Sequence, residues 1–275
     1  MAGRRNRLVM VTNDDGVQSP GIIALAEAIS QFSKVAIVGP EGPQSAAGMS
    51  LTFHKPLRVN TVTVGRWQCH AISGSPADSI MVGINKILPS RPALVVSGIN
   101  LGDNVTIQDI FASGTIAAAL EASVMGIPSI AFSMEVSDEE VLSGVGPGRF
   151  SEAARVAARI VREVLTRGLP RGVDLLNVNF PSNVTFDTPI KLTTLERRKY
   201  KDYVIERKDP RGRPYYWLWG ARLPVSDRDS DVYAVQKERA VSVTPLRLDF
   251  TPKSSTAIDR FGSRLARKEE DSTHK

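Results

Sequence analysis

At 275 residues, with 42% hydrophobic residues, the chain can form one large α/β domain or two small ones around a full core. Its apolar runs are too short for a membrane span, and Asp14 and Asp15 interrupt any secretory apolar stretch at the start, so we expect a cytoplasmic protein with no membrane partner. The single cysteine, Cys69, excludes an internal disulfide, and three scattered histidines argue against a histidine-rich zinc site or a histidine-based phosphatase.

The net charge of +6 is concentrated in two stretches. Residues 196–213 hold eight Lys and Arg against four acids, and the leader adds Arg4, Arg5 and Arg7. A local basic patch of this kind suits an anionic substrate, a partner chain or nucleic acid.

The first element of the chain ends in two adjacent carboxylates. Residues 8–11, Leu-Val-Met-Val, form the continuous apolar run of a parallel strand that is covered on both faces. Asn13-Asp14-Asp15-Gly16 follows at once, and two acids at the end of a core strand are costly unless a cation compensates them. The same four residues are also ordinary turn chemistry, so this stretch alone leaves both interpretations open.

A βαβ unit follows from this start, because a helix with apolar spacing at 21–32 precedes a second short strand at 35–38. The loop after it, 39–48, is rich in Gly and Pro and contains Ser45. Residues 57–64 alternate as in a half-exposed strand. Ser75, Pro76 and Asp78 suit the start of a helix over 79–88, a capping role that would by itself explain all three.

The middle of the chain continues the alternation of strands and helices. A buried strand at 93–97 runs into a polar loop at 98–104, and Ser113-Gly114-Thr115 opens a helix at 116–125. The remaining pattern predicts a strand at 128–133, a helix at 151–167, and strands at 175–180, 190–195 and 241–244. This order is typical of an α/β fold with a parallel sheet.

The sequence pattern in the last third of the chain predicts a protruding arm. Residues 196–240 contain the basic stretch, a turn near 209–212 and four clustered aromatic side chains: Tyr215, Tyr216, Trp217 and Trp219. We expect one domain over residues 1–250, including this arm, and a charged, frayed tail over 251–275.

The polar loops all follow strands, so they should meet at the carboxyl edge of the sheet. Two carboxylates, a hydroxyl and an amide from Asp14, Asp15, Ser45 and Asn100 converge there, and such oxygen donors suit Mg²⁺, Mn²⁺ or Ca²⁺. Ser113-Gly114-Thr115 offers backbone N–H groups for an anion, although an ordinary helix cap explains it equally well.

Five motifs in this order resemble the SurE family of metal-dependent nucleoside monophosphate phosphatases. They are Asn13-Asp14-Asp15-Gly16, the Ser45 loop, Gly74-Ser75-Pro76-Ala77-Asp78, Ser97-Gly98-Ile99-Asn100 with Asn104, and Ser113-Gly114-Thr115. The resemblance covers residues 7–244 and implies a Rossmann-like three-layer fold with a C-terminal hairpin arm. One segment departs from it: Leu101-Gly102-Asp103-Asn104 stands where members often carry Gly-Pro-Asn, so Asp103 adds a negative charge near the site.

The resemblance also implies roles for individual residues. One divalent metal ion per subunit would bind Asp14, Asp15, Ser45 and Asn100, with Asp14, Asp15 and Asn100 catalytic. We assign the substrate phosphate to Asn13, Gly48, Asn104, Ser113, Gly114 and Thr115. Exchange of the arm would build homodimers or homotetramers, and the acids interspersed along the arm disfavour a stable nucleic-acid partner.

Three functions compete at this point. The first is a phosphomonoesterase that hydrolyses nucleoside 5′-monophosphates, and also 3′-monophosphates, with a metal-activated water. The second is an aspartyl-phosphate phosphatase with Asp14 as nucleophile, but Gly16 stands where a second acid is usual. The third is a non-catalytic nucleotide- or RNA-binding protein; the usual glycine-rich phosphate cradles are missing, while the aromatic arm would suit base stacking.

Overall fold

The computed structural model describes residues 7–44, 46–252 and 255–266. Its strands are β1 (Leu8–Thr12), β2 (Lys34–Pro40), β3 (Val59–Val64), β4 (Trp67–Ile72), β5 (Leu94–Leu101), β6 (Ser129–Met134), β7 (Leu175–Phe180), β8 (Ile190–Leu192), β9 (Tyr200–Lys208), β10 (Pro214–Arg222) and β11 (Val241–Leu246). Its α-helices are α1 (Pro20–Ser30), α2 (Pro76–Val82), α3 (Ile107–Ala112), α4 (Gly114–Val124), α5 (Asp138–Ser143), α6 (Ser151–Arg167), α7 (Asp231–Gln236) and α8 (Thr256–Ala266).

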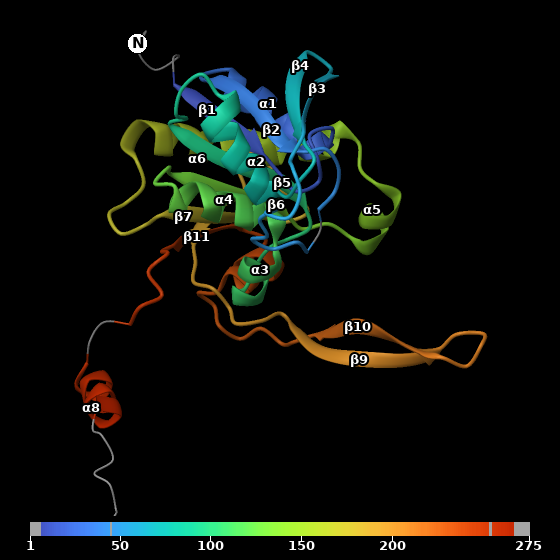
Figure 1. The fold of residues 1–275 in the computed structure, drawn as a ribbon, viewed down its shortest axis with the longest axis vertical. Coiled ribbons are helices and arrows are strands. Elements are labelled where there is room, and N and C mark those ends of the chain that lie inside the picture. The colour runs from blue at the N-terminus through green and yellow to red at the C-terminus, as the bar shows by residue number, and fades with distance from the viewer. Residues whose placement is uncertain (1–6, 45, 253–254, 267–275) are drawn as a thin grey trace, which may run out of the picture.

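The central sheet has nine strands in the order β3-β4-β2-β1-β5-β6-β7-β11-β8, with helices on both faces (Figure 1). Neighbours from β4 to β7 are parallel, whereas β3 and β11 pair antiparallel with β4 and β7. This architecture confirms the predicted α/β fold with a mostly parallel sheet.

Strand β1 is apolar from Leu8 to Val11, and both of its faces are covered. Val9 and Val11 pack in the cluster that contains the buried side of α1 and α6, whereas Met10 packs in the cluster of α2 and α4 on the opposite face. Burial of this central strand places the residues that follow it at the carboxyl edge of the sheet.

Several elements differ from the sequence prediction. The helix expected over 79–88 begins at Pro76, because Ser75 and Asp78 form a capping box, and it gives way to a π-helical turn at Gly83–Ile87. Residues 98–101, expected as loop, continue β5, since pairing with β6 resumes at Asn100 opposite Ser133 after a shift in register. Strand β4 and the short helices α3, α5 and α7 were not predicted.

The arm is a hairpin of β9 and β10, paired from Tyr200 opposite Arg222 to Lys208 opposite Pro214, and it points away from the sheet (Figure 1). The predicted arm of 196–240 is too long. Its last part forms α7, whose Val232 and Val235 are buried against the body, so these residues belong to the main domain.

The predicted frayed tail contains a helix. Residues 256–266 form α8, in which Ile258, Phe261 and Leu265 recur at helical spacing, and all of its described side chains are exposed. None of the helices in the described ranges is both long and apolar enough to cross a bilayer.

Candidate active site

An open pocket of about 290 Å³ lies where β1 and β5 end. Helix α1 follows β1 on one face of the sheet and α4 follows β5 on the other, so the pocket sits at a topological switch point, the usual ligand site of such sheets. The pocket is lined by Asp14, Asp15, Ala46, Asn100, Leu101, Gly102, Asp103, Asn104, Asp109, Ala112 and Ser113.

Asp14 is buried against the start of α4. The Thr115 hydroxyl donates a hydrogen bond to Asp14 Oδ1, and the Thr115 backbone also hydrogen-bonds the carboxylate. A Cβ at Gly114 would lie 2.7 Å from Asp14 Cβ, so only glycine lets the helix approach this closely. Burial raises the pKa of Asp14 despite these hydrogen bonds.

Asp15 lies beside Asp14 in the same pocket. Burial, and then the charge of Asp14, raise the pKa of Asp15 to about 7, although a backbone hydrogen bond at Leu101 opposes the shift. Two adjacent carboxylates that resist ionisation form a site that lacks positive charge. A bound cation would supply that charge.

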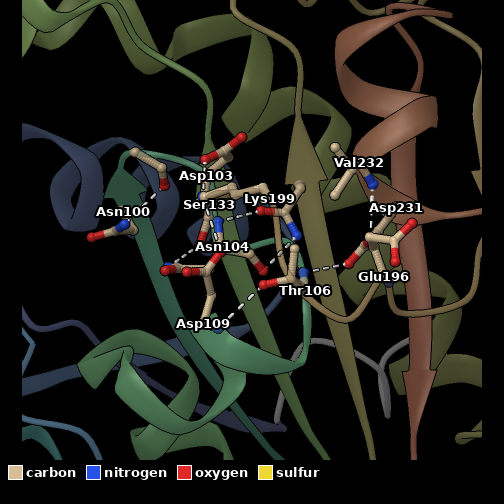
Figure 2. Close-up of polar contacts among 12 residues, drawn as sticks. Asn100, Asp103, Asn104, Thr106, Asp109, Ser133, Glu196, Lys199, Asp231 and Val232 are labelled. Carbon is tan, nitrogen blue, oxygen red and sulfur yellow. Dashed lines mark hydrogen bonds and ion pairs between the residues drawn. The ribbon is translucent and has the colours of Figure 1, made fainter. Parts of the chain in front are cut away.

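Asn100 and Asn104 face the pocket from the end of β5 and the loop after it (Figure 2). Asn100 Nδ2 donates to the Gly102 carbonyl at 2.8 Å, which leaves its Oδ1 as a ligand atom. The backbone N–H of Asn104 donates to Asn179 Oδ1 at 2.7 Å, and its side-chain Nδ2 donates to Ser133 Oγ at 2.8 Å. The ends of β6 and β7 therefore hold Asn104 in place.

The available donors fit a hard cation. The described residues contain no group of three or more His, Cys, Asp or Glu side chains arranged for a metal ion. A cation in this pocket would therefore bind two carboxylates together with neutral oxygen atoms, and Asn100 provides one of them. This donor chemistry suits Mg²⁺, Mn²⁺ or Ca²⁺.

The structure brings most of the predicted site residues together. Asp14, Asp15, Asn100, Asn104 and Ser113 line one pocket, with Gly114 and Thr115 directly behind Asp14. Ser45 lies outside the described residues, and its neighbour Ala46 lines the pocket.

Asn13 and Gly48, assigned to the substrate phosphate, do not line the pocket. Asn13 is fully buried, and its Nδ2 donates to the Gly16 carbonyl at 2.9 Å and to Ser19 Oγ at 2.7 Å. The Gly48 N–H donates to the Ala112 carbonyl at 3.0 Å. Both residues stabilise loops around the site.

Sequence reasoning missed four residues that shape the pocket: Ser133, Asn179, Asp109 and Lys199. The two asparagines in the buried strand Leu-Leu-Asn-Val-Asn-Phe were an available signal, because a buried amide requires a partner. Nothing in the local sequence indicated that Lys199 contacts Asp103 and Asp109.

Comparison with known proteins identifies the family. The family model described as survival protein SurE matches residues 9–202, which is more than half of the chain. The chain belongs to the SurE family.

Relatives within the SurE family match almost the whole chain. A 5′-nucleotidase SurE from Methanocella arvoryzae is 42% identical, covering 92% of this chain and 97% of its own. One from Thermococcus kodakarensis is 44% identical, covering 89% and 94%. The crystal structure of a SurE protein from Aquifex aeolicus superposes with a TM-score of 0.79 at 36% identity, covering 93% of this chain and 99% of that one.

The raised carboxylate pKa values predict that the metal-free protein loses stability as the pH rises. The folded pKa of Asp15, about 7, lies above its ordinary value of 3.8. The stability this group contributes is thus present below about pH 4 and is lost as the pH rises through about 7. In urea unfolding with a chelator, Asp15→Asn should have a higher midpoint than wild type at about pH 8 and an equal one at about pH 4.

The control for this measurement is Asp187→Asn, which removes an exposed carboxylate. The urea midpoint of Asp187→Asn should vary with pH as that of the wild type does. If Asp15→Asn and wild type had parallel pH profiles, Asp15 would not be the group that destabilises the metal-free fold.

Proposed function

We propose that this chain hydrolyses nucleoside 5′-monophosphates to nucleoside and phosphate, with a divalent cation bound by Asp14, Asp15, Asn100 and Ser45. The observation that carries the proposal is the pair of adjacent carboxylates with raised pKa values in an open pocket at the switch point of the sheet. The relatives from Methanocella arvoryzae and Thermococcus kodakarensis are both named 5′-nucleotidase SurE, which supports the same reaction.

Each group in the pocket has a separate role in the proposed reaction. The cation, when bound, supplies positive charge that polarises the phosphoryl group and lowers the pKa of a coordinated water. Thr115 fixes Asp14 Oδ1, which leaves Oδ2 for the cation or for orienting the attacking water. Ser113, whose oxygen caps α4 by accepting from the Ile116 N–H at 3.2 Å, keeps its own hydroxyl proton for a phosphate oxygen.

Asn104 supplies a further polar group of the proposed phosphate site. Its side-chain oxygen remains free to orient water or the protonated phosphate, because Nδ2 is used by Ser133. During hydrolysis, water forms the new bond to phosphorus, the ester bond to the nucleoside breaks, and the leaving oxygen takes up a proton.

The proposal includes assembly through the arm. Tyr216, Trp217 and Leu218 are 59%, 60% and 84% exposed on a two-stranded hairpin, and an isolated hairpin of this kind is marginal in water. We propose that a second copy of the chain covers these side chains in a homodimer or homotetramer.

Metal removal tests the reaction. Phosphate release from AMP should vanish in excess EDTA and return on addition of Mn²⁺ or Mg²⁺, whereas the far-UV circular dichroism should stay unchanged. A salt-sensitive RNA complex without phosphate release would favour a binding protein. Full activity in EDTA would refute the metal-dependent mechanism.

A further inference from the structure

Lys199 is a buried cation directly behind the wall of the pocket, where it pairs with two acids of the lining. It lies just before β9 at the base of the arm and is only 8% exposed. Its ammonium donates to Asp103 Oδ1 at 2.6 Å and to the Asp103 carbonyl at 3.0 Å, and it lies 2.9 Å from Asp109 Oδ2 (Figure 2). Both of these acids line the pocket.

The pocket is acidic without this lysine. Its lining includes four carboxylates, Asp14, Asp15, Asp103 and Asp109. Among the ion pairs of the described residues, the only cation that reaches this lining is Lys199. A phosphate monoester carries negative charge, so unpaired carboxylates on this wall would repel it. The repulsion would be strong because water and salt screen charges only weakly in a partly buried site.

The charge states of the group agree with an ion pair. Burial lowers the pKa of Lys199, but the charges of Asp103 and Asp109 outweigh that effect and raise it overall. Burial raises the pKa of Asp109 to about 6, although Lys199 opposes the shift. At neutral pH the ammonium is therefore charged.

The backbone around Lys199 is fixed to the same segment of the pocket. The Leu223 N–H, just after the returning strand β10, donates to the Lys199 carbonyl at 2.8 Å, and the Ile107 N–H donates to the Glu196 carbonyl at 2.8 Å. Asp231 accepts from the N–H groups of Thr106 at 2.8 Å and Glu196 at 3.0 Å. The base of the arm and residues 103–109 thus form one hydrogen-bonded unit.

We propose that Lys199 is a positioning residue for the anionic substrate: it neutralises the Asp103–Asp109 wall and holds that wall in place, so that a phosphate monoester can enter the pocket. The inference rests on the proposed function only for the identity of the ligand. It assigns to the base of the arm a role in substrate binding that is separate from assembly.

A charge-balanced set of variants tests the role. Asp103, Asp109 and Lys199 together carry −1; Lys199→Met makes this −2, and Lys199→Met with Asp103→Asn restores −1. Lys199→Met should raise the KM for AMP by about tenfold with kcat changed by less than about threefold. The double variant and Lys199→Arg should return KM to within about threefold of wild type.

A binding readout accompanies the kinetics. With Mg²⁺ present, inorganic phosphate should raise the melting temperature of wild type more than that of Lys199→Met. The control is Lys201→Met, which removes an exposed cation two residues along the same segment and should change neither KM nor the phosphate shift.

Two results would overturn the inference. One is a Lys199→Met protein with wild-type KM and a wild-type phosphate shift. The other is a folded double variant that binds as weakly as Lys199→Met, because shape rather than charge would then decide binding. If the wild type hydrolysed no nucleotide, the proposed function would fail, and the phosphate shift would still test Lys199 by itself.

Discussion

Asp14→Asn should lower kcat/KM for AMP by on the order of 10³-fold with saturating Mn²⁺, because in the proposed mechanism it removes a charged metal ligand and a group placed to orient the attacking water. The metal-free variant should melt at the same temperature as wild type or higher, since burial of the Asp14 charge is unfavourable. Steady-state kinetics and differential scanning calorimetry on the same preparation measure both effects.

The control for Asp14→Asn is Glu121→Gln, which neutralises a buried carboxylate on α4 that does not line the pocket. It should retain most of the activity. Two observations would count against the proposed role of Asp14: near-normal turnover of Asp14→Asn, or a trapped phosphoaspartate at position 14 in the wild type, which would indicate a covalent mechanism.

Replacement of residues 201–221 by a short Gly/Ser linker should give a smaller assembly in solution. This replacement removes most of β9 and β10 with their exposed aromatic side chains. It keeps Lys199 at the base of the arm and α7 in the body of the protein. Multi-angle light scattering of intact and armless proteins measures the change in mass directly.

A chain that lacks residues 251–275 is the matched control for the armless protein. It removes the exposed helix α8 and leaves the arm intact, so its mass should equal that of the intact assembly if the arm holds the subunits together. An armless protein of unchanged mass would refute arm exchange. The kcat/KM of the armless protein shows whether a partner's arm reaches the phosphate site. Each armless subunit keeps its own pocket, so a lower kcat/KM would indicate a contribution from the partner's arm.

The sequence by itself determined the main features of the sheet and the chemistry of the site. The apolar run of β1 is a local pattern that arises because the strand is buried on two faces. The helical spacing of apolar residues in α6 arises because that helix is buried on one face. The acids Asp14 and Asp15 directly follow the first of these elements. Because parallel strands share a carboxyl edge, the sequence pattern alone predicts the convergence of Asp14, Asp15 and Asn100.

The tertiary structure alone decided which polar groups meet and what each one does. Asn100 belongs to β5 rather than to a loop, because its pairing opposite Ser133 depends on a strand about thirty residues away in sequence. Asn13 resembles a ligand in sequence, but it is buried away from the pocket lining and its Nδ2 donates to Gly16 and Ser19. Lys199 belonged to a basic stretch of the arm in sequence, and the fold pairs it with Asp103, 96 residues earlier. Such contacts arise from long-range packing and chain topology, for which local composition and periodicity carry no signal.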